Sequence, residues 1–121
     1  RLDNQYHFTL DPCATIENAK CKKFYTKEQD GLKQSWENER VFCNPPYGRN
    51  IKEWVKKCHD EKDKAEVIIL LIPARTDTSY FHDYIYHKAE IRFIRGRLKF
   101  GESKTSAPFP SMVVIYNNQN N

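Results

Sequence analysis

The sequence predicts an α/β domain built on a mostly parallel central sheet with flanking helices. Segments of strand character alternate with segments that have the apolar spacing of helices, which is the pattern of α/β folds. Residues 67–72 are continuously apolar, as in a central strand buried on both faces of a parallel sheet. The length of 121 residues favours a single domain over 1–121, with the polar end 117–121 expected to fray.

Three short strands are predicted in the first part of the chain. Each contains aromatic or β-branched residues and is bounded by turn-forming residues. The first strand is expected at 6–10, where Asp11-Pro12 closes it, the second at 21–26 and the third at 40–43.

A helix is predicted to begin after Asn50. The Asn50 side chain can cap it, and Glu53 stands at the position for the reciprocal contact of a capping box. Apolar residues follow at the spacing of a buried helical stripe, and they are Ile51, Trp54, Val55 and Cys58.

The remaining elements follow the apolar run 67–72, which Lys64 and Pro73 bound. Residues 78–88 have helical periodicity, and Phe81, Tyr84 and Ile85 are expected to point inward. Strands are expected at 90–94 and 112–116. The basic segment 95–110 between them contains Gly96 and Gly101 and is predicted to be a loop or hairpin.

Polar turns directly follow three of the predicted strands. Ligands of α/β sheets bind outside the carboxyl ends of the strands, so these turns should gather along one edge. They are Asp11-Pro12, Asn44-Pro45-Pro46-Tyr47 and Pro73-Ala74-Arg75.

The turn that begins at Asn44 has the chemistry of a site for an exocyclic amine. The Asn44 side-chain oxygen and the Pro45 carbonyl can both accept hydrogen bonds from an NH₂ group. Pro45 and Pro46 fix φ and keep those acceptors aimed. Tyr47 offers a ring on which a planar base can stack. The alternative is that the prolines merely end the strand, and the turn alone does not choose between adenine, cytosine, an RNA base and a glutamine amide.

Charge and cysteine usage narrow the class of protein. The net charge of +4 fits an anionic partner without requiring one. No signal peptide and no membrane-spanning apolar run is present in the sequence, so a reduced cytosol is expected. The cysteines lack C-x-x-C spacing, which argues against a zinc site, and Cys43 and Cys58 are expected to be small buried apolar residues. The four cysteines are Cys13, Cys21, Cys43 and Cys58.

Cations concentrate in and before the segment 95–110, where they could contact phosphates. Gly96 and Gly101 would let the segment lie against a nucleic-acid backbone. The alternative is a solvated basic face. The cations concerned are Arg92, Arg95, Arg97, Lys99 and Lys104.

Several stretches in the same order resemble one family, the Dam-like DNA N6-adenine methyltransferases of bacteriophages and prophages. The resemblance runs from about residue 8 to residue 116. Its stretches are FTLDPCA at 8–14, NAKC at 18–21, DGL at 30–32, VFCNPPYG at 41–48, IPARTDT at 72–78, GRLKF at 96–100 and APFPSM at 107–112.

The resemblance implies an S-adenosylmethionine-dependent enzyme with a trimmed Rossmann-like methyltransferase fold, acting on an adenine flipped out of double-stranded DNA in a bacterial host cytoplasm, without a metal. It implies catalytic roles for Asn44, Pro45, Pro46 and Tyr47. For such an enzyme the basic residues Arg95, Arg97, Lys99 and Lys104 are expected to contact the DNA. It implies cofactor contacts by Asp11, Pro12, Cys13, Ala14, Asp30 and Asn44. From the residues alone, Asp11 and Asp30-Gly31 could instead be turn formers.

The chain departs from the family pattern at its start. Relatives have a cofactor-closing segment before the first strand, and this segment is expected to be missing because the sequence begins at Arg1. Two other functions therefore stay open. One is an amino-methyltransferase that acts on RNA or on a protein glutamine, and the other is a non-catalytic nucleic-acid-binding protein that retains the fold.

Overall fold

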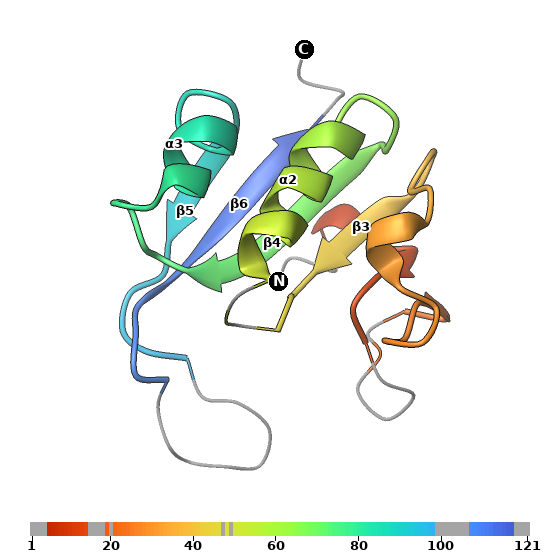
Figure 1. Ribbon diagram of the computed structural model, residues 1–121, viewed down its shortest axis with the longest axis horizontal. Helices are drawn as coiled ribbons and strands as arrows, with labels where there is room; N and C mark the ends of the chain where they lie inside the picture. The colour runs from red at the N-terminus through yellow and green to blue at the C-terminus, as the bar shows by residue number, and fades with distance from the viewer. Residues whose placement is uncertain are drawn as a thin grey trace.

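A six-stranded mixed sheet forms the centre of the molecule (Figure 1). The computed structural model describes residues 5–14, 19, 21–46, 48, 50–98 and 107–117. The strands are β1 (Leu10–Asp11), β2 (Lys23–Phe24), β3 (Arg40–Cys43), β4 (Val67–Pro73), β5 (Glu90–Phe93) and β6 (Ser111–Asn117). The described helices are the 3₁₀ turn η1 (Gly31–Lys33), α2 (Ile51–Glu61) and α3 (Ser79–Tyr84).

The strand order is β2-β1-β3-β4-β6-β5. Strands β1 to β4 are parallel to one another, whereas β6 runs antiparallel to both of its neighbours, β4 and β5. Antiparallel neighbours can be joined by a hairpin connection, and the segment 94–110 joins β5 to β6 in this way. The expectation of an α/β sheet is confirmed, but the sheet is mixed and not purely parallel.

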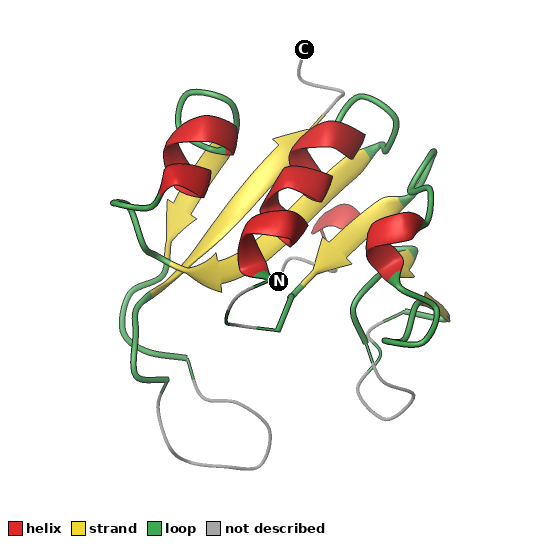
Figure 2. Cartoon of the chain, viewed as in Figure 1, coloured by secondary structure: helices red, strands yellow, loops and turns green. Residues whose placement is uncertain are grey.

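The larger part of the core lies between the sheet and the layer formed by α2 and α3. Trp54, Val55 and Cys58 of α2 are buried there, as the helical spacing predicted. On the opposite face of the sheet, Tyr6 and Phe8 pack against apolar residues of β4 and β6. Figure 2 shows α2 and α3 lying side by side across one face of the sheet.

The long apolar strand was predicted within one residue of its observed end. Strand β4 spans Val67–Pro73 and is buried along nearly its whole length, and it pairs with β3 on one side and β6 on the other. A strand with neighbours on both edges and packing on both faces has no solvated side, which explains the absence of polar alternation. The prediction for β3 at 40–43 is also confirmed.

The predicted first strand at 6–10 is wrong in its bounds. Tyr6 lies in a helical turn and His7 has a φ of +53°, so the backbone is not extended at these two residues, and β1 begins only at Leu10. The second strand is also shorter than the predicted 21–26, since only Lys23–Phe24 pair with β1. Each strand has only two residues, and β2 lies at the edge of the sheet, so periodicity over so few residues sets no firm boundary.

The predicted capping box at Asn50 is also wrong. Asn50 is the N-cap of α2, but its side chain makes no capping hydrogen bond. Its backbone carbonyl accepts from the N–H of Glu53 at 3.1 Å instead.

Helix α3 is shorter than the predicted 78–88 and ends at Tyr84. Its N-terminus has a side-chain cap, because the Thr78 side chain accepts from the N–H of Phe81.

The last predicted elements are close to those observed. Strand β5 ends at Phe93 rather than residue 94, and β6 extends by one residue at each end of the predicted 112–116. Residues 99–106, half of the predicted basic loop, and the tail residues 118–121 lie outside the described residues.

Candidate functional site

The carboxyl ends of β1, β3 and β4 meet at one edge of the sheet. The three strands are parallel, so the turns that follow them emerge on the same side, as the sequence predicted. Figure 1 shows the arrowheads of β3, β4 and β5 directed toward this edge. The edge therefore collects the turns that begin at Asp11, Asn44 and Pro73.

The order in which the chain adds strands to the sheet reverses between β1 and β3, although the strands themselves are parallel. From β1 the chain passes to β2 on one side, and it then returns to place β3 and β4 on the other side. Such a reversal opens a crevice between the two strand ends, which is where open α/β sheets bind ligands. The Sγ atoms of Cys13 and Cys43 lie 3.7 Å apart, so the turn after β1 directly contacts the end of β3.

The turn after β1 is held rigidly against the end of β2. The backbone carbonyl of Asp11 accepts from the N–H of Tyr25 at 3.0 Å, and the N–H of Ala14 donates to the carbonyl of Tyr25 at 3.0 Å. Asp11 is only 5% exposed, which is unusual for a carboxylate unless it has polar or charged partners. A buried carboxylate therefore stands at the carboxyl end of β1, beside the end of β3.

Gly31 packs directly against this turn. A Cβ atom at Gly31 would lie 2.1 Å from the carbonyl oxygen of Pro12, so only glycine permits the observed approach. The carbonyl of Gly31 accepts from Nε1 of the buried Trp36 at 3.1 Å. The approach of Gly31 to Pro12 brings the segment that contains Asp30 beside the turn that contains Asp11. Strand β2 separates these two segments in the sequence.

Asp30 has a structural role of its own. Its φ is +53°, and its Oδ1 accepts from the N–H of Leu32 at 3.2 Å, so it caps η1. Its Oδ2 lies 4.0 Å from Nζ of Lys33. The turn-former interpretation of Asp30 is therefore supported by the geometry, and the predicted cofactor contact stays a prediction.

The turn after β3 begins at a buried thiol. Burial raises the pKa of the Cys43 thiol, and its contact with Cys13 acts in the same direction, so this sulfur stays protonated. Asn44 follows at half-buried exposure, Pro45 is buried and Pro46 is exposed. Tyr47 lies outside the described residues.

The turn after β4 is tied to the start of β6. The N–H of Ala74 donates to the carbonyl of Pro110 at 2.8 Å, and the guanidinium of Arg75 lies 5.8 Å from the centre of the Phe109 ring. Ser111 follows and is 1% exposed, and its Oγ has no hydrogen-bond partner in the described part of the chain. Sequence reasoning gave Ser111 no role, although it lies in one of the family-like stretches.

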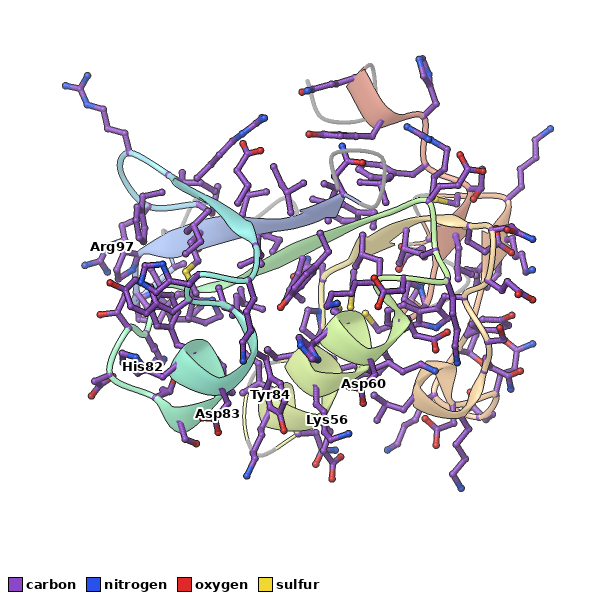
Figure 3. The ribbon with its side chains drawn as sticks, turned by 90° about the horizontal axis from the view of Figure 1, so that it is seen from above. Lys56, Asp60, His82, Asp83, Tyr84 and Arg97 are labelled. Carbon is purple, nitrogen blue, oxygen red and sulfur yellow. The ribbon has the colours of Figure 1, made fainter. Side chains whose placement is uncertain are left out.

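The predicted DNA-contacting cations differ in their surroundings. Arg92 pairs with Glu90 at 2.7 Å, and Arg97 donates to the carbonyl of Ala107 at 3.4 Å. Arg95 and Arg97 are both exposed, whereas Lys99 and Lys104 lie outside the described residues. Figure 3 shows Arg97 well apart from the Lys56–Asp60 pair of α2.

A second network, which sequence reasoning missed, fixes α2 against the η1 segment. The buried carboxylate of Glu61 accepts from the N–H of Trp36 at 2.7 Å and pairs with Lys57 at 3.7 Å. Lys57 also donates to the carbonyl of Gln34 at 2.6 Å and lies over the Trp36 ring. The signal available in the sequence was a glutamate four residues after a lysine in the predicted helix, a spacing at which the two side chains can pair. The network holds in place the segment that carries Gly31.

No group of three or more histidine, cysteine, aspartate or glutamate side chains is arranged to hold a metal ion among the residues that the structure describes. No described helix combines the length and the apolar character needed to cross a bilayer.

Comparisons with known proteins agree on one family. The family described as "DNA N-6-adenine-methyltransferase (Dam)" matches residues 1–120. A DNA N-6-adenine-methyltransferase of Escherichia phage T1 is 36% identical over 99 residues, covering 80% of this chain. The aligned part is 41% of that relative, so the chain spans about two fifths of the relative's length.

Proposed function

The chain belongs to the DNA N-6-adenine-methyltransferase (Dam) family, and from this premise we propose that it methylates the exocyclic amine of adenine in double-stranded DNA. The methyl donor in this proposal is S-adenosylmethionine, and the place of action is the cytoplasm of a bacterial host. One observation supports the proposal most strongly. The turn that carries Asp11 and the turn that carries Asn44 meet at the reversal of the sheet, joined by the contact of Cys13 with Cys43.

The topology is compatible with a trimmed Rossmann-like methyltransferase fold. Four parallel strands with a reversal between β1 and β3 provide the crevice that such folds use for a nucleoside-containing ligand. The antiparallel β6 lies between β4 and β5, and in this proposal the second substrate lies at the part of the edge beyond β4. The two ligands would then meet above β3, where Asn44 lies.

The chemistry of the turn after β1 fits the cationic part of S-adenosylmethionine. That cofactor supplies an electrophilic methyl group and carries ammonium and sulfonium charges. The buried carboxylate of Asp11 would hold the ammonium group, and the turn of Pro12, Cys13 and Ala14 would line the cavity. Asp30 would accept from the adenine amine of the cofactor through the oxygen that is not used by its cap.

Asn44 and Pro45 would hold the target amine. The Asn44 side-chain oxygen and the Pro45 carbonyl would accept its two hydrogens, which orients the nitrogen lone pair toward the methyl carbon. When bound, S-adenosylmethionine would supply the methyl group and leave as the neutral thioether, and the methylated amine would lose a proton to water. Tyr47 would stack on the adenine, with Pro46 holding the turn. A base inside a duplex cannot reach this crevice, so the adenine must be flipped out.

The direct test is methyl transfer from tritiated S-adenosylmethionine to DNA duplexes. We expect incorporation into adenine-containing duplexes, with RNA of the same sequence and a glutamine-containing protein as controls. Incorporation only into RNA or protein would assign the chain to another substrate class. Absence of transfer together with DNA binding would favour a non-catalytic nucleic-acid-binding protein.

Asp11→Asn should weaken binding of S-adenosylmethionine at least tenfold. The change removes the charge but keeps the shape, and a hydrogen bond to a charged group contributes about 1.5–3 kcal/mol. Isothermal titration calorimetry measures the Kd. Asp83→Asn is the matched control, because Asp83 is an exposed aspartate on α3 and its change should leave the Kd unaltered. An unchanged Kd in a folded Asp11→Asn protein would remove this carboxylate from the cofactor site.

Changing Arg95 and Arg97 together to alanine should flatten the salt dependence of DNA binding. Both side chains are exposed beyond the end of β5. Each lost phosphate contact lowers the slope of log K against log salt by about 0.9, so the pair should lower it by about 1.8. Fluorescence anisotropy over a salt series measures the slope.

The matched control for this pair is the double change of Lys52 and Lys56 on α2. Lys52 is exposed and Lys56 pairs with Asp60 at 2.6 Å, so we expect a smaller effect on the slope. A larger effect of the α2 pair would move the DNA-binding surface to that helix. Lys57 is unsuited to this test because it stabilises the packing of Trp36.

A further inference from the structure

Phe93 is the most exposed large apolar side chain in the described part of the chain. Its exposed fraction is 64%, and the other exposed large apolar residue, Tyr86, is 47% exposed. Tyr86 contacts the rings of Phe81, His82 and His87, whereas the described residues give Phe93 no ring contact. A phenyl ring this exposed gains little from folding, so its position decides what it can do.

Phe93 stands at the same edge of the sheet as the candidate site. Strand β5 is antiparallel to β6, and β6 is antiparallel to β4, so β5 runs parallel to β4 and ends at the shared edge. Phe93 is its last residue and pairs with Met112. The N–H of the next residue, Ile94, donates to the carbonyl of Ser111 at 3.1 Å, which fixes the backbone there.

The lateral separation between Phe93 and the end of β3 suits a duplex. Three strand spacings separate β5 from β3, which is about 14 Å. A flipped adenine rotates about its backbone by roughly half a turn, leaving the base stack and entering the enzyme. If Asn44 holds the flipped adenine, a side chain that fills its vacated place in the base stack would lie a similar distance away from Asn44.

The charge around Phe93 identifies the partner as a polyanion. Arg92 stands immediately before it, and the exposed Arg95 and Arg97 follow within four residues. Arg92 pairs with Glu90, so the charge available to a partner comes from the exposed Arg95 and Arg97, which follow the end of β5. An apolar protein surface would not match these cations, while DNA offers both phosphates and stacked bases.

We propose that Phe93 is a wedge that enters the base stack where the target adenine has left it. The inference rests on the proposed methylation of duplex DNA. Apolar side chains that insert between base steps are a known means of stabilising unstacked DNA. The phenyl ring replaces stacking that the flipped base gave up, and Arg95 and Arg97 hold the phosphates beside it.

The test compares Phe93→Ala with the wild-type chain on two duplexes. In one duplex the target adenine is paired with thymine, and in the other it stands opposite an abasic site and is easily extruded. We expect Phe93→Ala to lower the initial methylation rate about tenfold on the paired duplex, because unstacking a paired base costs a few kcal/mol. On the abasic duplex the rate should stay within about twofold of the wild-type rate.

Four further comparisons make the test specific. Fluorescence of 2-aminopurine at the target position should rise on binding of the wild-type chain and rise less with Phe93→Ala. Phe93→Leu should restore part of the signal because it remains an apolar wedge. Tyr86→Ala removes the other exposed aromatic ring and should match the wild-type chain on both duplexes. The salt slope should not change with Phe93→Ala, since no charge is lost.

The outcomes separate the wedge from the activity on which it rests. An equal loss of rate on both duplexes, or none on either, overturns the wedge while methylation stands. A wild-type chain that methylates neither duplex overturns the proposed function and this inference with it. The wild-type chain could also sediment as a dimer and Phe93→Ala as a monomer, with the ratio of rates on the two duplexes unchanged. That result assigns the ring to a protein interface and also overturns the wedge.

Discussion

Asn44→Ala should reduce methyl transfer to adenine by about 10²-fold or more, with the fold intact. The change deletes an acceptor for the target amine, and removal of one oriented polar contact in a catalytic site has effects of this size. Asn44 is half-buried beyond the end of β3, so truncation leaves the apolar core of the sheet unchanged. Single-turnover transfer of a tritiated methyl group measures the chemical step directly.

Asn44→Asp provides the matched comparison. An aspartate of nearly the same shape still offers acceptor oxygens, so it should retain more activity than alanine, although its charge disturbs the geometry. Both variants should bind S-adenosylmethionine with a Kd close to that of the wild-type chain if the residue acts mainly on the amine. A normal transfer rate in the folded alanine variant would remove Asn44 from the catalytic site.

Gly31→Ala should destabilise the fold by about 1–3 kcal/mol and also weaken cofactor binding, because the added methyl group has no space. The new Cβ would lie 2.1 Å from the carbonyl oxygen of Pro12, and that oxygen belongs to the backbone rather than to a mobile side chain. Either η1 or the Asp11 turn must move. Urea unfolding measures the free energy of unfolding, and calorimetry measures the Kd for S-adenosylmethionine.

Gly96→Ala is the comparison that isolates crowding from backbone strain. Gly96 has a φ of +76° but nothing within 4 Å of an added Cβ, so only the left-handed backbone is penalised, by about 1–2 kcal/mol. It should leave cofactor affinity unchanged, since it lies beyond β5. If Gly31→Ala were as stable as the wild-type chain and bound the cofactor equally well, the close approach of Gly31 to Pro12 would be needed neither for stability nor for cofactor binding.

The strongly apolar elements could be predicted from the sequence because their burial leaves a periodic signal. Strand β4 is apolar throughout because it is paired on both edges, and α2 shows its stripe because one face contacts the sheet. The first strand could not be placed, because only Leu10–Asp11 is extended and the left-handed His7 precedes it. The capping box predicted at Asn50 is wrong because a side chain that can cap a helix does not always adopt the rotamer that makes the hydrogen bond.

The sequence by itself determined the chemistry offered at each strand end and the order of the turns that carry it. Parallel strands send those turns to one edge, so the gathering of Asp11 and Asn44 followed from alternation alone. Only the tertiary structure decided which turns touch. The contact of Cys13 with Cys43 and the seating of Gly31 on Pro12 join residues far apart in the chain. Such contacts depend on strand order and close packing, for which local sequence patterns carry no signal.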